Sequence, residues 1–127
     1  MDDRYRKTTG SVGEDRALDH LRGHGLQLIA RNYRCRRGEI DLVMLDGVTL
    51  ALIEVRYRSR NDFGGAAASV TPSKQRRLIL AAEHLVGMHA QLRQYAARFD
   101  VVALDGEKDA PKIEWIRNAF TSEGKDW

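Results

Sequence analysis

The stretch that decides the fold is residues 39–56, EIDLVMLDGVTLALIEVR, in which two apolar runs flank Asp46-Gly47. Asp-Gly between two such runs is a strong signal for a two-residue hairpin turn. The stretch therefore predicts antiparallel strands over 39–45 and 48–56, with Leu45 paired to Val48.

This predicted register places two carboxylates on one face of the hairpin. Asp41 then lies opposite Leu52, and Glu54 is its diagonal neighbour on the same face because side chains alternate with period two. Diagonal neighbours lie about 7–8 Å apart, so their carboxylates can converge on one ion. The same spacing also suits a buried salt bridge between Arg56 and either carboxylate, and both interpretations stay open on spacing alone.

The patterns on either side of the hairpin predict an α/β domain. Ser11 precedes Glu14 by three positions, which is the capping-box spacing at a helix start. Pro72 suits the first turn of a later amphipathic helix, and apolar alternation marks the strands. In chain order, the predicted elements are a helix over 12–24, strands over 26–34, 39–45 and 48–56, a helix from Pro72 to about Gly87, and strands over 98–104 and 112–116.

Length and composition suit one small globular domain. The chain has 127 residues, of which 43% are hydrophobic and 31% charged. We expect a flexible leader over 1–10, the domain over 11–120 and a C-terminal tail over 121–127. No apolar stretch suits a membrane span or a secretory signal, so the expected location is the cytoplasm.

The metal-binding residue types other than carboxylates are sparse. Cys35 is the only cysteine, which excludes an intrachain disulfide and a cysteine-based zinc cage. His20 and His24 have the i, i+4 spacing of a metal pair on a helix, but no third ligand of the usual kind lies nearby in sequence. A plain surface pair is the favoured interpretation.

The basic residues are concentrated in the first two thirds of the chain. Residues 4–77 hold fifteen Lys and Arg against eight Asp and Glu, whereas the net charge of the whole chain is +3. Sixteen of the twenty-one basic residues are arginine, whose planar fork suits phosphate. The distribution indicates either a polyanionic partner or a solvated basic surface.

Several short segments together carry a family resemblance. They are Gly13-Glu14, Arg31-Asn32-Tyr33-Arg34, Gly38-Glu39-Ile40-Asp41-Leu42-Val43, Ile53-Glu54-Val55-Arg56, Lys74-Gln75-Arg76-Arg77-Leu78 and Arg98-Phe99-Asp100-Val101-Val102. In this order and spacing, over residues 10 to 120, the chain resembles the YraN family, also called UPF0102. That family is similar in turn to archaeal Holliday junction resolvases and to the wider PD-(D/E)xK nuclease superfamily.

The resemblance implies a fold and a set of site residues. The fold is a restriction-endonuclease-like αβββαβ core, a central mixed sheet flanked by helices, which agrees with the element order above. Asp41 and Glu54 correspond to the acidic residues of the superfamily site, with Glu14 as a further acidic residue near the metal and Gln75 as a polar residue of the following helix. The implied cofactor is Mg²⁺ or Mn²⁺, for which carboxylate oxygens are natural ligands.

Arg56 departs from the superfamily pattern, which has lysine at this position. Arginine stays charged and can steady the charge of a phosphoryl group, but it cannot easily accept a proton. The resemblance implies a nucleic-acid-binding protein acting as a metal-dependent endonuclease on branched or damaged DNA, and as a homodimer. The alternatives are a module of the same fold that binds nucleic acid without cutting it, and a protein–protein adaptor.

The remaining predicted contacts are basic residues that flank the carboxylates in sequence. Their role would be to bind phosphates with a salt-dependent and largely sequence-independent affinity. They are Arg34, Arg36, Arg37, Arg58, Arg60, Lys74, Arg76 and Arg77. Asp100, in a buried-looking strand, is expected to be a structural partner for an arginine.

Overall fold

A computed structural model describes residues 9–58, 69–106 and 111–122 of the chain, with backbone alone at 9–11 and at Arg58. The predicted leader over 1–10 falls almost wholly outside these residues. The described elements are α1 (Thr9–Gly23), β1 (Gln27–Cys35), β2 (Gly38–Asp46), β3 (Thr49–Arg58), α3 (Pro72–Met88), the 3₁₀ helix η1 (Ala90–Gln94), β4 (Ala96–Asp105) and β5 (Lys112–Phe120).

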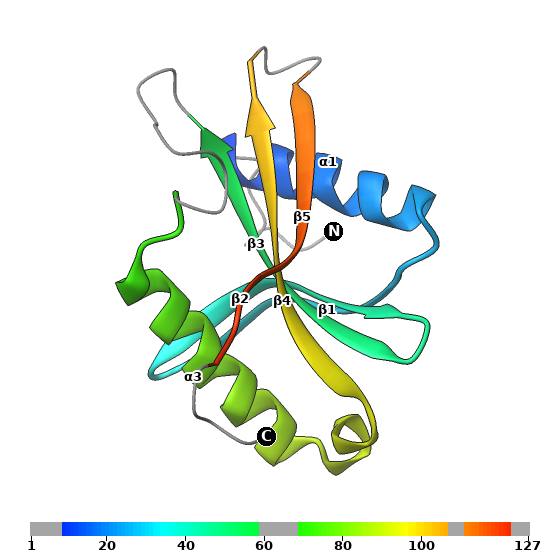
Figure 1. Cartoon of the computed structure of the whole chain (residues 1–127), viewed down its shortest axis with the longest axis vertical. Coiled ribbons are helices and arrows are strands. Elements are labelled where there is room, and N and C mark those ends of the chain that lie inside the picture. Colours follow the sequence, from blue (N-terminus) through cyan, green and yellow to red (C-terminus); the bar gives the residue numbers. More distant parts are fainter. Residues whose placement is uncertain (1–8, 59–68, 107–110, 123–127) are drawn as a thin grey trace, which may run out of the picture.

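The five strands form one mixed sheet in the order β1-β2-β3-β4-β5 (Figure 1). β3 and β4 are parallel, because α3 connects them as a crossover, and the other neighbours are antiparallel. The predicted order of a helix, three strands, a helix and two strands is therefore confirmed, as is the αβββαβ core. The 3₁₀ helix η1 between α3 and β4 was not predicted.

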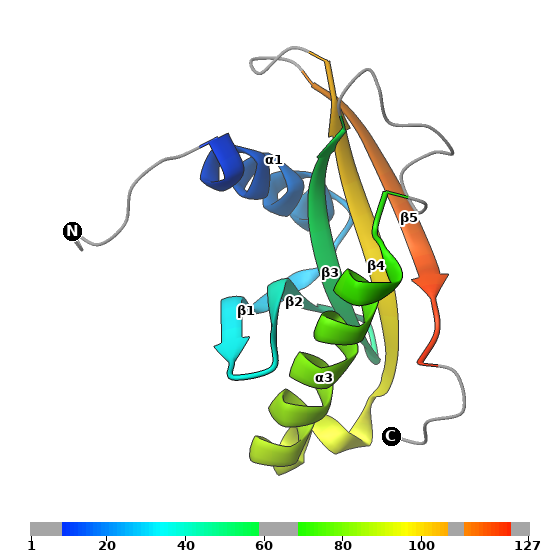
Figure 2. The ribbon, with the colours of Figure 1, turned by 90° about the vertical axis from the view of Figure 1, so that its left-hand side faces the viewer.

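The two helices cover opposite faces of the sheet (Figure 2). On one face Leu50 and Leu52 of β3 pack against Leu78 and Leu85 of α3, which we call the α3 cluster. On the other face Ala51 and Ile53 pack with residues of α1, which we call the α1 cluster. Alternation along β3 thus divides the core into two layers, as the period-two pattern requires.

The first strand of the predicted hairpin departs from this alternation at one residue. Ile40 was expected on the same face as Leu42 and Met44, but it lies in the α3 cluster while they lie in the α1 cluster. The ladder between β2 and β3 begins at Leu42, so the first residues of β2 are free to turn toward α3. A Cβ at Gly38 would lie only 1.9 Å from the carbonyl oxygen of Arg77, which shows how closely the start of β2 approaches that helix.

The start of α1 was predicted too late. The helix begins at Thr9, so Ser11 lies inside its first turn and is not the N-cap. Glu14 does not complete a capping box either, because its carboxylate accepts a hydrogen bond from Arg31 of β1. Among the described residues no helix is long and apolar enough to cross a membrane.

Candidate functional site

The hairpin turn lies one residue further along the chain than predicted. Asp46 pairs with Thr49, and the turn is Gly47-Val48, with Gly47 at φ +62° as the first position of a type II′ turn requires. The predicted pairing of Leu45 with Val48 was therefore wrong. The ladder between β2 and β3 runs from Leu42 paired with Ile53 to Asp46 paired with Thr49, and Asp41 and Glu54 lie just beyond its open end.

The two carboxyl groups of this pair, Asp41 and Glu54, lie in contact at the point where β2 leaves β3. Their carboxyl groups lie within hydrogen-bonding reach of each other, and the backbone N–H of Val55 donates to Asp41 Oδ2 at 2.8 Å. Burial, and then the charge of Glu54, raise the pKa of Asp41 from 3.8 to about 8. Burial also raises the pKa of Glu54. Asp41 is therefore largely protonated at neutral pH.

Glu14 lies near this carboxyl pair but is held by another partner. Its charge contributes to the raised pKa of Asp41. Its Oε1 lies 3.3 Å from Nε of Arg31, and Nη2 of the same arginine lies 2.7 Å from Oδ1 of Asp15. Arg31 thus fixes Glu14 at the α1 side of the pair. Within the described ranges no three His, Cys, Asp or Glu side chains form a ready-made metal cage.

The carboxyl pair has the donor chemistry of a hard divalent cation. Mg²⁺ is commonly bound by one or two carboxylates, several waters and substrate phosphates rather than by an all-protein cage. Two half-buried carboxyls lying side by side match that pattern. If Mg²⁺ or Mn²⁺ binds here, Asp41 and Glu54 are the residues that would hold it, with Glu14 as an outer neighbour.

Basic residues from α3 lie against Glu54. Thr71 caps the helix by accepting a hydrogen bond from the backbone N–H of Lys74 at 3.3 Å, and Pro72 occupies the first turn. Lys74 and Arg77 then line a small cavity of about 90 Å³ together with Glu39 and Glu54. The positive charges of Lys74 and Arg56 act to lower the pKa of Glu54, against the larger effect of its burial.

Glu39 was not predicted as a site residue, yet it lines this cavity. Its charge raises the pKa of both Asp41 and Glu54. Its position two residues before Asp41 in a strand was the available signal, since such residues share a face.

Arg56 follows Glu54 by two residues on β3, where the superfamily pattern has lysine. Its Nε is buried and has no hydrogen-bond partner in the described part of the structure. A buried donor without a partner is uncommon and costs free energy. Arg56 therefore keeps a hydrogen-bonding capacity that the described side chains do not use.

Gln75 follows Lys74 on α3. Its Nε2 donates to the carbonyl oxygen of Val70 at 3.0 Å, and it lines a groove of about 660 Å³ between α3 and the end of β5. The structure brings Asp41, Glu54 and Glu14 into one neighbourhood, and the amide N–H of Gln75 is engaged by the backbone.

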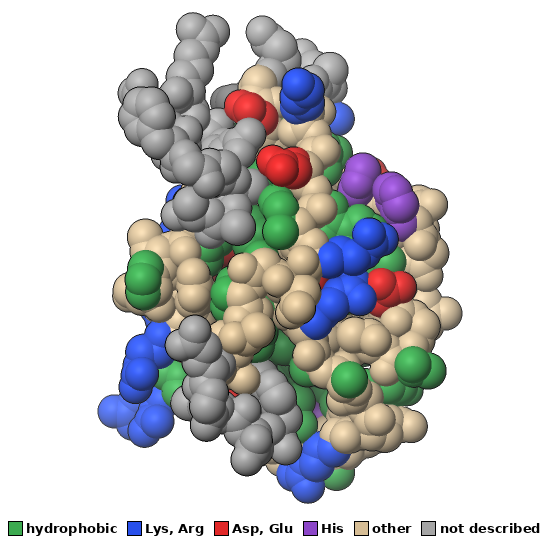
Figure 3. All heavy atoms as spheres, in the orientation of Figure 1, with side chains coloured by type: hydrophobic (Ala, Val, Ile, Leu, Met, Phe, Trp, Pro, Cys, Tyr) green, Lys and Arg blue, Asp and Glu red, His purple; other side chains and the backbone are tan. Residues whose placement is uncertain are grey.

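The other predicted basic residues lie on the surface around the start of β2 and the first turns of α3. Arg36 and Arg37 form the exposed turn between β1 and β2, and Arg76 is exposed on α3. Arg34 Nε lies 3.4 Å from Glu39 Oε2, with 73% of the Arg34 side chain exposed. Figure 3 shows Lys and Arg side chains gathered below the N-terminal end of α3. The side chain of Arg58 and all of Arg60 lie outside the described residues.

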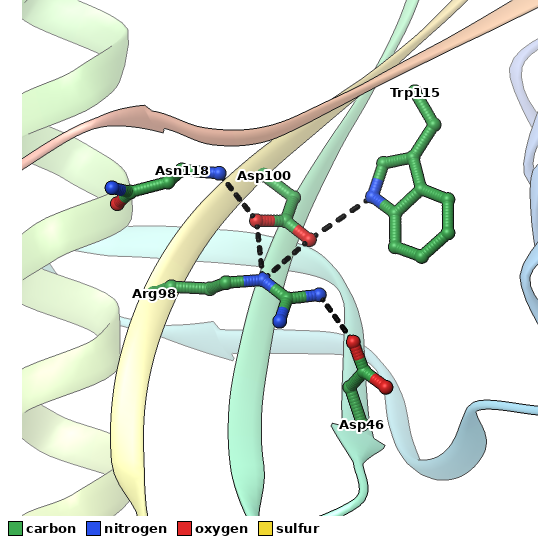
Figure 4. A network of polar contacts seen from close by, with 5 residues as sticks. All are labelled: Asp46, Arg98, Asp100, Trp115 and Asn118. Carbon is green, nitrogen blue, oxygen red and sulfur yellow. Dashed lines mark hydrogen bonds and ion pairs between the residues drawn. The ribbon is translucent and has the colours of Figure 1, made fainter.

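Asp100 is a structural residue, as expected. It is 0% exposed and accepts hydrogen bonds from Arg98 Nε at 3.0 Å, Trp115 Nε1 at 3.0 Å and the backbone of Asn118 at 2.9 Å (Figure 4). Arg98 also binds Asp46 Oδ2 through Nη2 at 2.8 Å. This network fastens the tip of the β2–β3 hairpin to β4 and β5.

The fold and the carboxyl pair define a class: a single-domain α/β protein with a restriction-endonuclease-like αβββαβ core and paired acidic residues where β2 and β3 separate. Residues 13–104 match the Uncharacterised protein family UPF0102, and the chain belongs to this family.

The relatives match along most of their length. A UPF0102 protein of Alkalilimnicola ehrlichii is 50% identical over 116 residues, which cover 91% of this chain and 89% of that protein. A UPF0102 protein of Cupriavidus pinatubonensis is 57% identical over 122 residues, which cover 91% of this chain and 90% of that protein. A UPF0102 protein of Ralstonia nicotianae is 57% identical over 116 residues, which cover 88% of this chain and 85% of that protein.

Proposed function

We propose that this protein binds nucleic acid, DNA in particular, and hydrolyses phosphodiester bonds at Asp41 and Glu54 with Mg²⁺ or Mn²⁺. The observation that carries the proposal is the half-buried pair of Asp41 and Glu54, with the pKa of both carboxyls raised, beside Lys74 and Arg77. Carboxyl groups kept buried at such a cost are typical of functional sites.

The proposed reaction is a displacement at phosphorus. The oxygen of a water molecule forms a bond to phosphorus, the bond to the leaving oxygen breaks, and that oxygen takes up a proton. A bound divalent cation supplies Lewis acidity and a more acidic water.

The residues of this chain hold and steady the reacting groups. Asp41 and Glu54 would hold the cation, Asp41 after giving up its proton, and the Val55 amide keeps Asp41 oriented. Lys74 and Arg77 hold the neighbouring phosphate. The positive charge of Arg56, two residues beyond Glu54 on β3, steadies the phosphoryl group as its charge increases.

Cleavage is tested with purified protein on branched, single-stranded and duplex DNA in the presence of Mg²⁺ or Mn²⁺. We expect cleavage of at least one substrate, lost in Asp41→Ala and in Glu54→Gln. The matched control is Asp19→Asn, an exposed carboxylate on α1, which should cleave like the wild type. Cleavage no greater than that of Asp41→Ala on every substrate would overturn the catalytic proposal.

A second candidate function is binding without cleavage. The guanidinium at Arg56 and the lack of a third carboxylate ligand within the described residues favour it. In that case binding needs no divalent cation and survives Glu54→Ala, which removes a negative charge from the phosphate path and so tightens binding. A requirement of Mn²⁺ for binding, lost in Glu54→Ala, would exclude this second candidate.

A further inference from the structure

The C-terminal half of α1 carries a histidine pair that the carboxyl site does not use. His20 and His24 lie four residues apart and therefore on one face of the helix. Their ring centroids are 4.7 Å apart and their planes are inclined by 45°. Two nitrogens that share one metal at the usual 2.0–2.1 Å lie roughly 3.3 Å apart. Rings whose centroids are this close can each turn one nitrogen toward a shared ion.

The hydrogen bond of His24 prepares one of its nitrogens as a ligand. Its Nδ1 lies 2.9 Å from the backbone oxygen of His20. A carbonyl oxygen only accepts, so Nδ1 carries the proton and Nε2 of the neutral ring keeps a free lone pair. This is the arrangement in which metal-binding histidines are usually held, with the second ring nitrogen bonded to a carbonyl or a carboxylate.

His20 is held in the neutral form that binds metals. Burial, and then the neighbouring His24, lower its pKa. A neutral imidazole offers a lone pair at physiological pH. The pair is also accessible, since His24 is exposed and His20 is partly exposed, and Figure 3 shows two His side chains together on one face of the molecule.

Trp115 of β5 lies beside both rings in a fixed position. Its ring centroid is 6.5 Å from that of His20 and 5.5 Å from that of His24, edge-on to both. The indole N–H is bonded to buried Asp100 (Figure 4), and the Arg117 guanidinium lies 3.7 Å from the ring centroid. The tryptophan therefore reports directly on any ion bound between the histidines.

We propose that His20 and His24 bind a late first-row divalent metal ion, of the Zn²⁺, Ni²⁺ and Cu²⁺ class, through one nitrogen each. The described side chains supply no third ligand, so water occupies the other positions. Imidazole selects these metals, whereas carboxylate oxygens select Mg²⁺ and Mn²⁺. The pair is separate from the carboxyl site, because His24 lies ten residues beyond Glu14, roughly 15 Å along the helix axis. The inference does not depend on the proposed function.

The test is calorimetric titration of the full chain with NiCl₂, together with tryptophan fluorescence. We expect Asp41→Asn, which disables the carboxyl site, to bind one Ni²⁺ per chain. Adding His20→Gln or His24→Gln should weaken this binding at least ten-fold, and Trp115→Phe should remove the fluorescence quenching without weakening binding. Adding His89→Gln, an exposed histidine elsewhere, should leave binding unchanged. Binding in Asp41→Asn no tighter than after adding His24→Gln, or binding lost on adding His89→Gln, would overturn the proposal.

Discussion

At the scale of single residues, the surroundings of Asp41 raise the pKa of its carboxyl group. An isolated aspartate in water is ionised at neutral pH, but burial and the adjacent Glu54 raise its pKa to about 8. The single hydrogen bond from the Val55 amide stabilises the ionised form and only partly offsets these effects. The folded protein therefore holds a proton at neutral pH that the unfolded chain releases.

From the proton held by Asp41 we predict how the stability of the protein depends on pH in the absence of divalent cations. Between the unfolded pKa of 3.8 and the folded pKa of about 8, the native state binds more protons than the unfolded state. The free energy of unfolding should therefore fall as pH rises through this window and level off above it. Urea unfolding of the wild type and of Asp41→Asn, measured at several pH values, tests this. Asp41→Asn should show a flatter profile, and equal slopes would contradict the assigned proton.

The β2–β3 hairpin shows, at the scale of elements, how far local sequence determines the site. The apolar pattern and Asp46-Gly47 correctly predicted two paired strands, and the structure brings Asp41 and Glu54 close together where the strands separate. The predicted pairs of opposite residues were wrong. The hydrophobic pattern could not distinguish the predicted register from the observed one, because both registers place the same side chains on the same faces. The ion pair between Asp46 and Arg98, 52 residues apart, favours the observed register, and no local signal contains it.

In the network around Arg98, we expect removal of Arg98 to reduce stability more than removal of Asp46. Arg98→Met leaves the fully buried Asp100 without its arginine and should cost about 3–5 kcal/mol. Asp46→Ala removes a partly exposed partner and should cost about 0.5–1.5 kcal/mol. Urea unfolding of both variants measures the difference. Equal losses would contradict the view that Asp100 is the anchor of this network.

The start of β2 approaches α3 so closely at Gly38 that a larger residue should not fit there. A Cβ at this position meets the carbonyl oxygen of Arg77 at 1.9 Å. Gly38→Ala should therefore lower the free energy of unfolding by about 1–3 kcal/mol through overpacking. It should also weaken nucleic-acid binding, because it displaces Lys74 and Arg77. Gly23→Ala is the matched control, because a Cβ there meets nothing within 4 Å. Thermal unfolding compares the two, and equal melting temperatures would show that the contact is not constraining.

At the scale of the whole molecule, the topology gathers positive charge on one side of the carboxyl pair. The β1–β2 turn with Arg36 and Arg37 comes next to the first turns of α3, because Gly38 lies against Arg77. The sequence indicated which residues are basic and in which part of the chain. It did not show that Gln75 would turn to Val70 or that Arg31 would hold Glu14, since both depend on how α1, β1 and α3 pack.

This arrangement predicts a salt-dependent affinity for DNA. The logarithm of the binding constant should fall linearly with the logarithm of salt concentration, and Lys74→Ala or Arg77→Ala should each reduce the slope by about 1. Fluorescence anisotropy with a labelled duplex and a labelled branched DNA measures the slopes. Arg93→Ala, in η1 beyond the C-terminal end of α3, serves as the control. An unchanged slope in both site variants would place the DNA on another surface.

The central claim, that Asp41 and Glu54 form a site for a divalent cation, is tested most directly by proton release on Mn²⁺ binding. Calorimetry at pH 7 in two buffers of different ionisation enthalpy measures that release. Because the raised pKa keeps a proton on Asp41 at pH 7 that the cation must displace, we predict that the wild type releases protons as Mn²⁺ binds. Asp41→Asn should release fewer protons and bind more weakly. Mn²⁺ binding of equal strength in both proteins, or wild-type binding with no proton released, would contradict the claim.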